Sequence, residues 1–184
     1  MSDSIQTFRT EVRGLVAPRH VILDGQGERL GSLHVRRNRL GMVVHADYRP
    51  VQGEVLHLRR DPGLLRAQFS LWTESREWLG SSLRWSTFRR QIDVWTGGKP
   101  YRMVPTPGFG RGWRVLASKT GEVARIEAGV LSRDTTLSVH RKLDFELLVF
   151  CYFLGSLVLR EAFFPTSLAA LEEEPRSQPS ATKA

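Results

Sequence analysis

One apolar stretch, residues 147–159 (LLVFCYFLGSLVL), constrains the fold of this chain more than any other feature. Asp144 can cap a helix at this point, and Glu146 suits the positive end of a helix dipole. Because Pro165 cannot continue a helix, the sequence predicts one over about residues 144–163. Its uncharged part rises only about 20 Å, against roughly 30 Å for a hydrocarbon core, so we expect no transmembrane segment. Apolar residues point in nearly every direction around this helix, which must therefore be surrounded by protein.

Short candidate strands with apolar or alternating residues fill most of the chain before this helix. Turn signals such as Asp24-Gly25-Gln26-Gly27 and Lys119-Thr120-Gly121 separate them. Strands at such regular intervals, with no helical period between them, favour a sandwich or a barrel over a βαβ sheet. The candidates are residues 20–23, 30–35, 41–45, 54–59, 64–72, 82–85, 91–95, 101–104, 113–117, 122–127 and 136–141.

Two segments look like copies of one hairpin. Residues 22–33 (ILDGQGERLGSL) and 116–127 (LASKTGEVARIE) both place a Gly-Glu pair after a polar turn, so Gly27 aligns with Gly121. Glycine at this point suits a turn residue with positive φ. The repeat favours a barrel built by duplicating a hairpin, and chance similarity between β turns is the alternative.

These strands, the repeated hairpin and the segment SVHRKLDFELLVFCYFLGSLVLREAFF together resemble the tubby C-terminal-like superfamily, most closely its LURP-one-related and phospholipid scramblase branches. The stretches GWRVLASKTGEVARIEAG and TLSVHRKLDFELLVFCYFL carry most of the resemblance. It implies a mainly β fold, an antiparallel barrel of about twelve strands that encloses a hydrophobic C-terminal helix. The barrel domain would span residues 17–170, after an N-terminal extension (1–16) that adds a strand or a helix, and before a disordered acidic and polar tail (171–184).

The same resemblance implies a non-catalytic binding module. Tubby-like domains bind phosphoinositides through basic residues on the barrel, which makes anionic lipid the expected ligand. Scramblase activity is disfavoured, because no acidic calcium-loop pattern follows the helix and no proline-rich arm precedes the barrel. The exact basic pattern of the tubby phosphoinositide site is not recognisable, so no binding residue is carried over.

Arginine clusters supply most of the net charge of +8, which attracts phosphate. Arginines gathered in turns could converge at one end of a barrel and hold phosphates with their forked donors. One alternative is that the arginines form a solvated surface whose charge is incidental, on a protein-interaction or scaffold module with no lipid ligand. Another is that they bind an acidic protein partner. The candidate lipid- or phosphate-binding residues are Arg36, Arg37, Arg39, Arg59, Arg60, Arg89 and Arg90.

Single-stranded nucleic acid is a second alternative ligand for the same charge. Trp72, Trp78, Trp85 and Trp95 are interleaved with arginines, and aromatic platforms beside cations bind unpaired bases. Alternation along a strand also places such aromatic residues in a core, and we prefer that interpretation for most of them.

No catalytic constellation stands out, so we expect no enzyme. His34, His45 and His57 each lie between apolar residues and could bind a metal if one face aligned them. No carboxylate at a suitable place completes the set, so the prediction is no metal and no cofactor. Cys151, the single cysteine, lies in the apolar helix and is expected to be inert packing. Without a recognisable signal peptide, we expect a cytoplasmic protein that is peripheral at the membrane.

Overall fold

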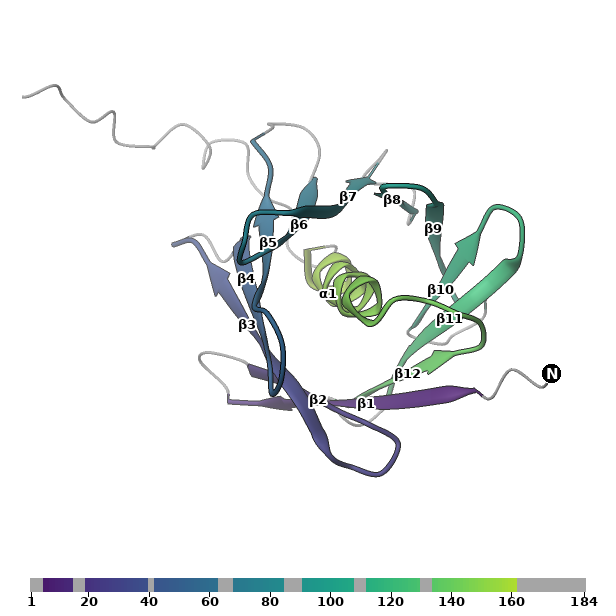
Figure 1. The fold of residues 1–184 in the computed structure, drawn as a ribbon, viewed down its shortest axis with the longest axis horizontal. Helices are drawn as coiled ribbons and strands as arrows, with labels where there is room; N and C mark the ends of the chain where they lie inside the picture. Colours follow the sequence, from purple (N-terminus) through teal and green to yellow (C-terminus); the bar gives the residue numbers. More distant parts are fainter. Residues whose placement is uncertain are drawn as a thin grey trace, which may run out of the picture.

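A closed ring of twelve antiparallel strands surrounds one helix in the computed structural model of the chain (Figure 1). The structure describes residues 5–14, 19–39, 42–62, 68–84, 91–107, 112–129 and 134–161. The strands are β1 (Gln6–Arg13), β2 (Arg19–Leu23), β3 (Arg29–Arg37), β4 (Val43–Pro50), β5 (Leu56–Arg60), β6 (Phe69–Thr73), β7 (Trp78–Arg84), β8 (Ile92–Thr96), β9 (Pro100–Pro105), β10 (Gly112–Ala117), β11 (Gly121–Ala128) and β12 (Thr135–Val139). The predicted fold class is confirmed.

The ring follows the order of the chain, because each strand pairs with the next one. β1 then closes the barrel by pairing with β12, in a register that runs from Gln6 opposite Val139 to Thr10 opposite Thr135. The segment assigned to an N-terminal extension therefore supplies one strand of the ring. Each of the predicted strands overlaps one of β2 to β12.

The helix α1 (Phe145–Glu161) lies in the middle of the ring and is seen almost end-on in Figure 1. The amide of Leu148 donates to the carbonyl of Asp144 at 3.0 Å, which makes Asp144 the residue at which the helix begins. From residue 147 to residue 155 every side of the helix is buried. Among the described residues, no helix is long and apolar enough to cross a membrane.

The core is formed between the inward side chains of the strands and those of α1. Leu58 and Phe69 are fully buried on β5 and β6, and Phe150 is fully buried on the helix. The rings of Phe69 and Phe153 meet edge to face with their centroids 5.1 Å apart. Such contacts place the helix as the filling of the barrel and add to the hydrophobic stabilisation.

The two repeated hairpins share a backbone geometry. Gly27, between β2 and β3, has φ of 86°, and Gly121, the first residue of β11, has φ of 74°. The prediction of left-handed turn glycines is confirmed. Both hairpins also carry a register shift near this turn, at Ile22/Leu23 in one and at Val115/Leu116 in the other.

One predicted strand boundary is wrong in a way that matters for the site. Residues 41–45 were expected to form a strand that stops at His45, but β4 continues to Pro50. The extension is held by pairing on both sides, with β3 and with β5. Its Tyr48 is buried in the core. Asp47 is therefore a strand residue rather than part of a loop.

Candidate functional site

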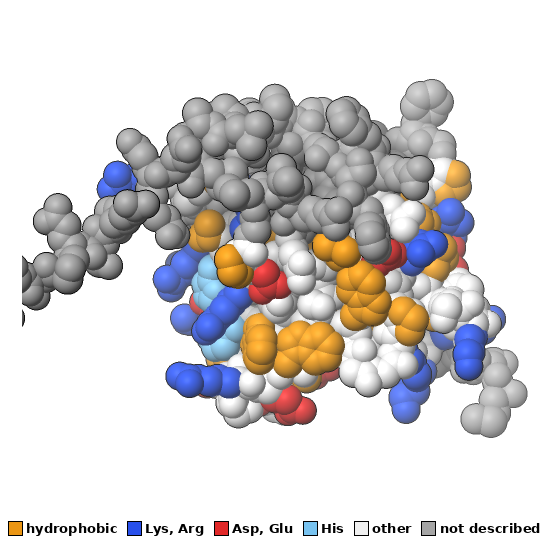
Figure 2. Space-filling view, turned by 90° about the horizontal axis from the view of Figure 1, so that it is seen from above, with side chains coloured by type: hydrophobic (Ala, Val, Ile, Leu, Met, Phe, Trp, Pro, Cys, Tyr) orange, Lys and Arg blue, Asp and Glu red, His pale blue; other side chains and the backbone are white. Residues whose placement is uncertain are grey.

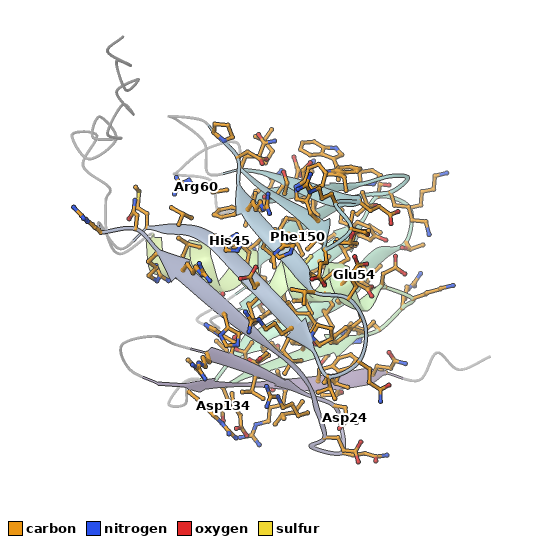
Figure 3. The ribbon with its side chains drawn as sticks, turned by 60° about the vertical axis from the view of Figure 1, so that its left-hand side comes forward. Asp24, His45, Glu54, Arg60, Asp134 and Phe150 are labelled. Carbon is orange, nitrogen blue, oxygen red and sulfur yellow. The ribbon has the colours of Figure 1, made fainter. Side chains whose placement is uncertain are left out.

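Five of the predicted arginines come together at one end of the barrel. Arg36 and Arg37 end β3, Arg39 lies just beyond them, and Arg59 and Arg60 end β5. Arg36 and Arg59 are both paired with His45 of β4, which lies between them. Figure 3 shows Arg60 and His45 toward this end of the barrel and Glu54 toward the other. The remaining two predicted residues, Arg89 and Arg90, lie outside the described residues.

The five arginines differ in what they can reach. Arg36, Arg39 and Arg59 are exposed, and within the described part of the chain none of them takes part in an ion pair. Arg60 is half-buried and donates from Nη1 to the carbonyl oxygen of Val43 at 3.4 Å. Arg37 is also half-buried, opposite Val43. The three exposed arginines are therefore the ones placed to contact a ligand.

A cluster of two histidines and one carboxylate lies between these arginines on the outer wall. Asp47 is paired directly with His57 across the β4–β5 ladder, and His45 precedes it by two residues on the same face. His45 Nε2 and His57 Nδ1 each lie 2.7 Å from the same oxygen, Asp47 Oδ1. The two imidazole rings stack at 6.0 Å between centroids with 22° between their planes. We call His45, Asp47 and His57 the outer-wall triad.

Sequence reasoning found two members of this triad but missed the third. A metal site needs a carboxylate beside the histidines. The predicted strand ended at His45, so Asp47 was not expected to lie on the same strand face as the histidines. The signal was present in the alternation of His45, Ala46 and Asp47, in which Ala46 is fully buried and its two neighbours point outward.

Local contacts shift the pKa values of Asp47, a member of the triad, and of His34, which is paired with it on β3. Burial raises the pKa of Asp47, but the hydrogen bond from His57 and the charge and hydrogen bond of His45 outweigh it, so the pKa lies below the usual value. The pKa of His34 is lowered by burial and by the charges of Arg19 and Arg49. Asp47 is therefore an anion at neutral pH, and the His34 ring, 3.2 Å from Ser32 Oγ, is uncharged.

Tryptophans continue the same outer wall beyond the triad. Trp72 on β6 is paired with His57 of β5 and with Trp78 of β7. Trp78 and Trp95 are 39% and 37% exposed, and Trp72 is half-buried, so the expected core positions are wrong for these residues. The interior is already filled by the aromatic residues of α1. Figure 2 shows hydrophobic side chains beside histidine and basic side chains on one face. Trp85 lies outside the described residues.

A groove of about 350 Å³ joins the basic and aromatic parts of this wall. Its lining includes His57 and Arg59 of β5, Trp72 of β6, and one carboxylate and one arginine of the turn after β6, Glu74 and Arg76. Arg76 has φ of 69°, in the turn between β6 and β7, a backbone conformation that costs energy for a residue with a side chain. Its backbone is held by a hydrogen bond to the carbonyl of Thr73 at 3.1 Å.

A larger cavity of about 930 Å³ opens at the other end of the barrel, beside the start of α1. Apolar residues such as Leu56 and Leu71 line it, together with four carboxylates and one arginine. Burial, and then the charge of Glu146, raise the pKa of Tyr48 in its wall to about 12. An excess of carboxylates repels phosphate, so a phosphate ligand suits the arginine end instead. The carboxylates are Glu28, Glu54, Asp144 and Glu146, and the arginine is Arg29.

Comparison with known proteins adds a fold relationship. A solved structure of a protein from Arabidopsis thaliana, AT5G01750, superposes with a TM-score of 0.57 over 87% of this chain and 93% of that one. The two share 16% sequence identity, so the likeness shows a common fold alone. No family model and no curated protein matches the chain.

Proposed function

We propose that this chain is a non-catalytic module that attaches peripherally to anionic membrane surfaces. Arg36, Arg39 and Arg59 contact lipid phosphates, and the barrel serves as a rigid mount for them. The resemblance of the sequence to the tubby C-terminal-like superfamily supports this assignment, as does the positive net charge.

The observation that carries the proposal is that the exposed arginines share the outer wall with exposed tryptophans. Three exposed arginines without ion pairs among the described residues lie at one end of this wall, and one of them, Arg59, also lines the groove that runs past Trp72 toward the β6–β7 turn. Trp78 is paired with Trp72 beside this groove. Arginine forks match phosphate geometry, and tryptophan favours the boundary between head groups and hydrocarbon. At about 1 kcal/mol for each basic residue near an anionic surface, the three arginines contribute about 3 kcal/mol. This corresponds to a partition coefficient onto anionic vesicles on the order of 100-fold higher than that of the chain without these three arginines.

Flotation with vesicles tests the proposal directly. Phosphatidylcholine vesicles are compared with vesicles that also contain phosphatidylserine or a phosphoinositide, at low and at high salt. We expect binding to the anionic vesicles alone, weakened by salt because exposed charges are screened. The triple variant Arg36→Ala, Arg39→Ala, Arg59→Ala should lose roughly two orders of magnitude in partition.

A matched control separates a site from bulk charge. Lys99→Ala, Lys119→Ala and Lys142→Ala remove the same charge from exposed positions that adjoin β9, β11 and α1, at the end of the barrel where α1 begins. The lysine variant should bind like the original chain. Equal losses in the two triple variants would show that net charge alone drives binding, and absence of binding to anionic vesicles would end the proposal.

Single-stranded nucleic acid is the competing ligand that the exposed tryptophans favour. Base stacking on Trp78 or Trp95 would quench tryptophan fluorescence during titration with an oligonucleotide, and binding would weaken steeply with salt. Quenching without vesicle binding would replace the membrane with nucleic acid as the partner. If neither ligand binds, a protein partner that stays bound at high salt would favour the scaffold alternative.

A further inference from the structure

We infer that the outer-wall triad, His45, Asp47 and His57, is a binding site for a divalent transition-metal ion. The inference does not rest on the membrane proposal. Each of the three residues offers one ligand atom, and these atoms lie within 4.8 Å of one another. Both histidine nitrogens already point at one carboxylate oxygen, at 2.7 Å.

The frame that holds these side chains is rigid. His45 and Asp47 lie within β4 and His57 lies within β5, and β4 is hydrogen-bonded to β3 on one side and to β5 on the other. In a site with metal–ligand distances of about 2.0–2.2 Å, tetrahedral ligand atoms stand about 3.4 Å apart. Each nitrogen therefore needs to move away from the carboxylate oxygen by less than about 1 Å, and the two nitrogens, which lie within 4.8 Å of each other, need to reach the same separation; side-chain rotations supply these movements. Sites built on strands hold their ligands with little movement of the backbone.

The chemistry of the ligands selects the class of ion. Two imidazoles with one carboxylate suit Zn²⁺, Co²⁺ or Fe²⁺, whereas Ca²⁺ and Mg²⁺ prefer sets made of oxygen atoms. Three protein ligands leave at least one coordination position open. The histidine side chains are 25% exposed and Asp47 is 11% exposed, so that position faces the solvent side of the wall.

The neighbouring arginines have two opposite effects on such an ion. Arg36 and Arg59, on either side of His45, repel a cation and so weaken its binding, although both are exposed and therefore screened by water and salt. They also attract an anion to the open coordination position. The site is therefore suited to hold an ion together with an anionic ligand, rather than as a closed structural centre.

His34 is a control histidine, because it lies beside the triad but is not one of the proposed ligands. It is paired with Asp47 from the β3 side, on the same wall, but its Nε2 lies 3.2 Å from the hydroxyl of Ser32. It is the nearest described histidine outside the triad along this ladder. A site made of the triad should not need it.

Cobalt titration of the protein, prepared without a histidine tag, tests the inference. Co²⁺ bound by the triad gives visible d–d absorption that saturates at one ion for each chain, and Zn²⁺ added afterwards should remove it. Zn²⁺ should also raise the Tm, because an ion that binds the folded state alone stabilises it. His57→Gln and Asp47→Asn should each weaken binding at least tenfold, while His34→Gln should leave it unchanged.

Circular dichroism and a urea midpoint measured in EDTA show whether each variant is folded, and His45→Gln replaces any variant that is not. A chain that gives no cobalt absorption would overturn the inference. So would undiminished binding in the double variant His45→Gln, His57→Gln. A loss in His34→Gln as large as that in His57→Gln would refute the assignment to these three residues.

Discussion

Gly155 is the residue at which the enclosed helix can be tested most directly, because two opposite effects act there. Alanine in the interior of a helix is favoured over glycine by about 1 kcal/mol. A Cβ atom at Gly155, however, would lie 2.8 Å from Cδ1 and 3.2 Å from Nε1 of Trp113. Trp113 lies on β10 and is 1% exposed, so its rigid indole ring is enclosed by the core. Overpacking of this kind costs about 1–3 kcal/mol.

The steric cost should win, since the contact is far inside van der Waals distance and involves a ring rather than a flexible chain end. Once the gain in helix propensity is subtracted, we expect Gly155→Ala to lower the free energy of unfolding by up to about 2 kcal/mol, or the Tm by up to roughly 8 °C in a chain of this size. Urea titration followed by circular dichroism measures this change. In a Trp113→Phe background the smaller ring makes room, so the same substitution should become neutral or stabilising.

The double-mutant cycle isolates the contact, with an expected coupling of about 1 kcal/mol or more. A Gly155→Ala variant that is about 1 kcal/mol more stable than the original chain would mean that helix propensity acts alone. In that case Gly155 of α1 would not pack closely against Trp113 of β10, which would contradict the arrangement with the helix packed inside the barrel.

Two other substitutions and one thiol report on the same interior. Leu154→Asp places a charge where the leucine is 2% exposed and should abolish the soluble protein in a cell lysate, whereas Val44→Asp, at a 38% exposed position, should not. A folded Leu154→Asp variant would contradict the enclosed-helix arrangement. Burial raises the pKa of Cys151 to about 12, so at pH 8 a disulfide reagent should modify this thiol only after unfolding in urea. Because the folded state favours the neutral thiol, its contribution to stability is complete below pH 9 and falls as the pH rises toward 12, and Cys151→Ala should show a smaller decline over that range.

The helix and the hairpin turns could be predicted because their signals are local. Asp144, the uncharged run and Pro165 predicted a helix over residues 144–163, and the structure places it at Phe145–Glu161. Gly27 and Gly121 revealed their turns because a positive φ favours glycine. Signals of this kind need no knowledge of which strands pair.

The residues that meet on the outer wall could be predicted only in part, because the pairing register of the strands determines which residues lie side by side. Arg36 and Arg59 are 23 residues apart in the chain, but both are paired with His45 of β4. No residue near either arginine in the sequence indicates this pairing. Asp47 was missed because aspartate is depleted in strands, yet here pairing on both sides and the burial of Tyr48 carry β4 through it. For Trp78 and Trp95, alternation shows that a strand has two faces but not which one is inward.

The seam between β1 and β12 also determines when this protein can fold. Thr10 and Thr135, which are 125 residues apart in the chain, lie opposite each other in that pair. During synthesis the ring cannot close before β12 has left the ribosome, and α1, which fills the interior, is made later still. Contacts of such long range form slowly, because a large loss of chain entropy comes before any gain from packing. Until then the nascent chain presents open strand edges and unburied apolar faces, so we expect folding to wait for the synthesis of α1 and to depend on chaperones that shield those edges.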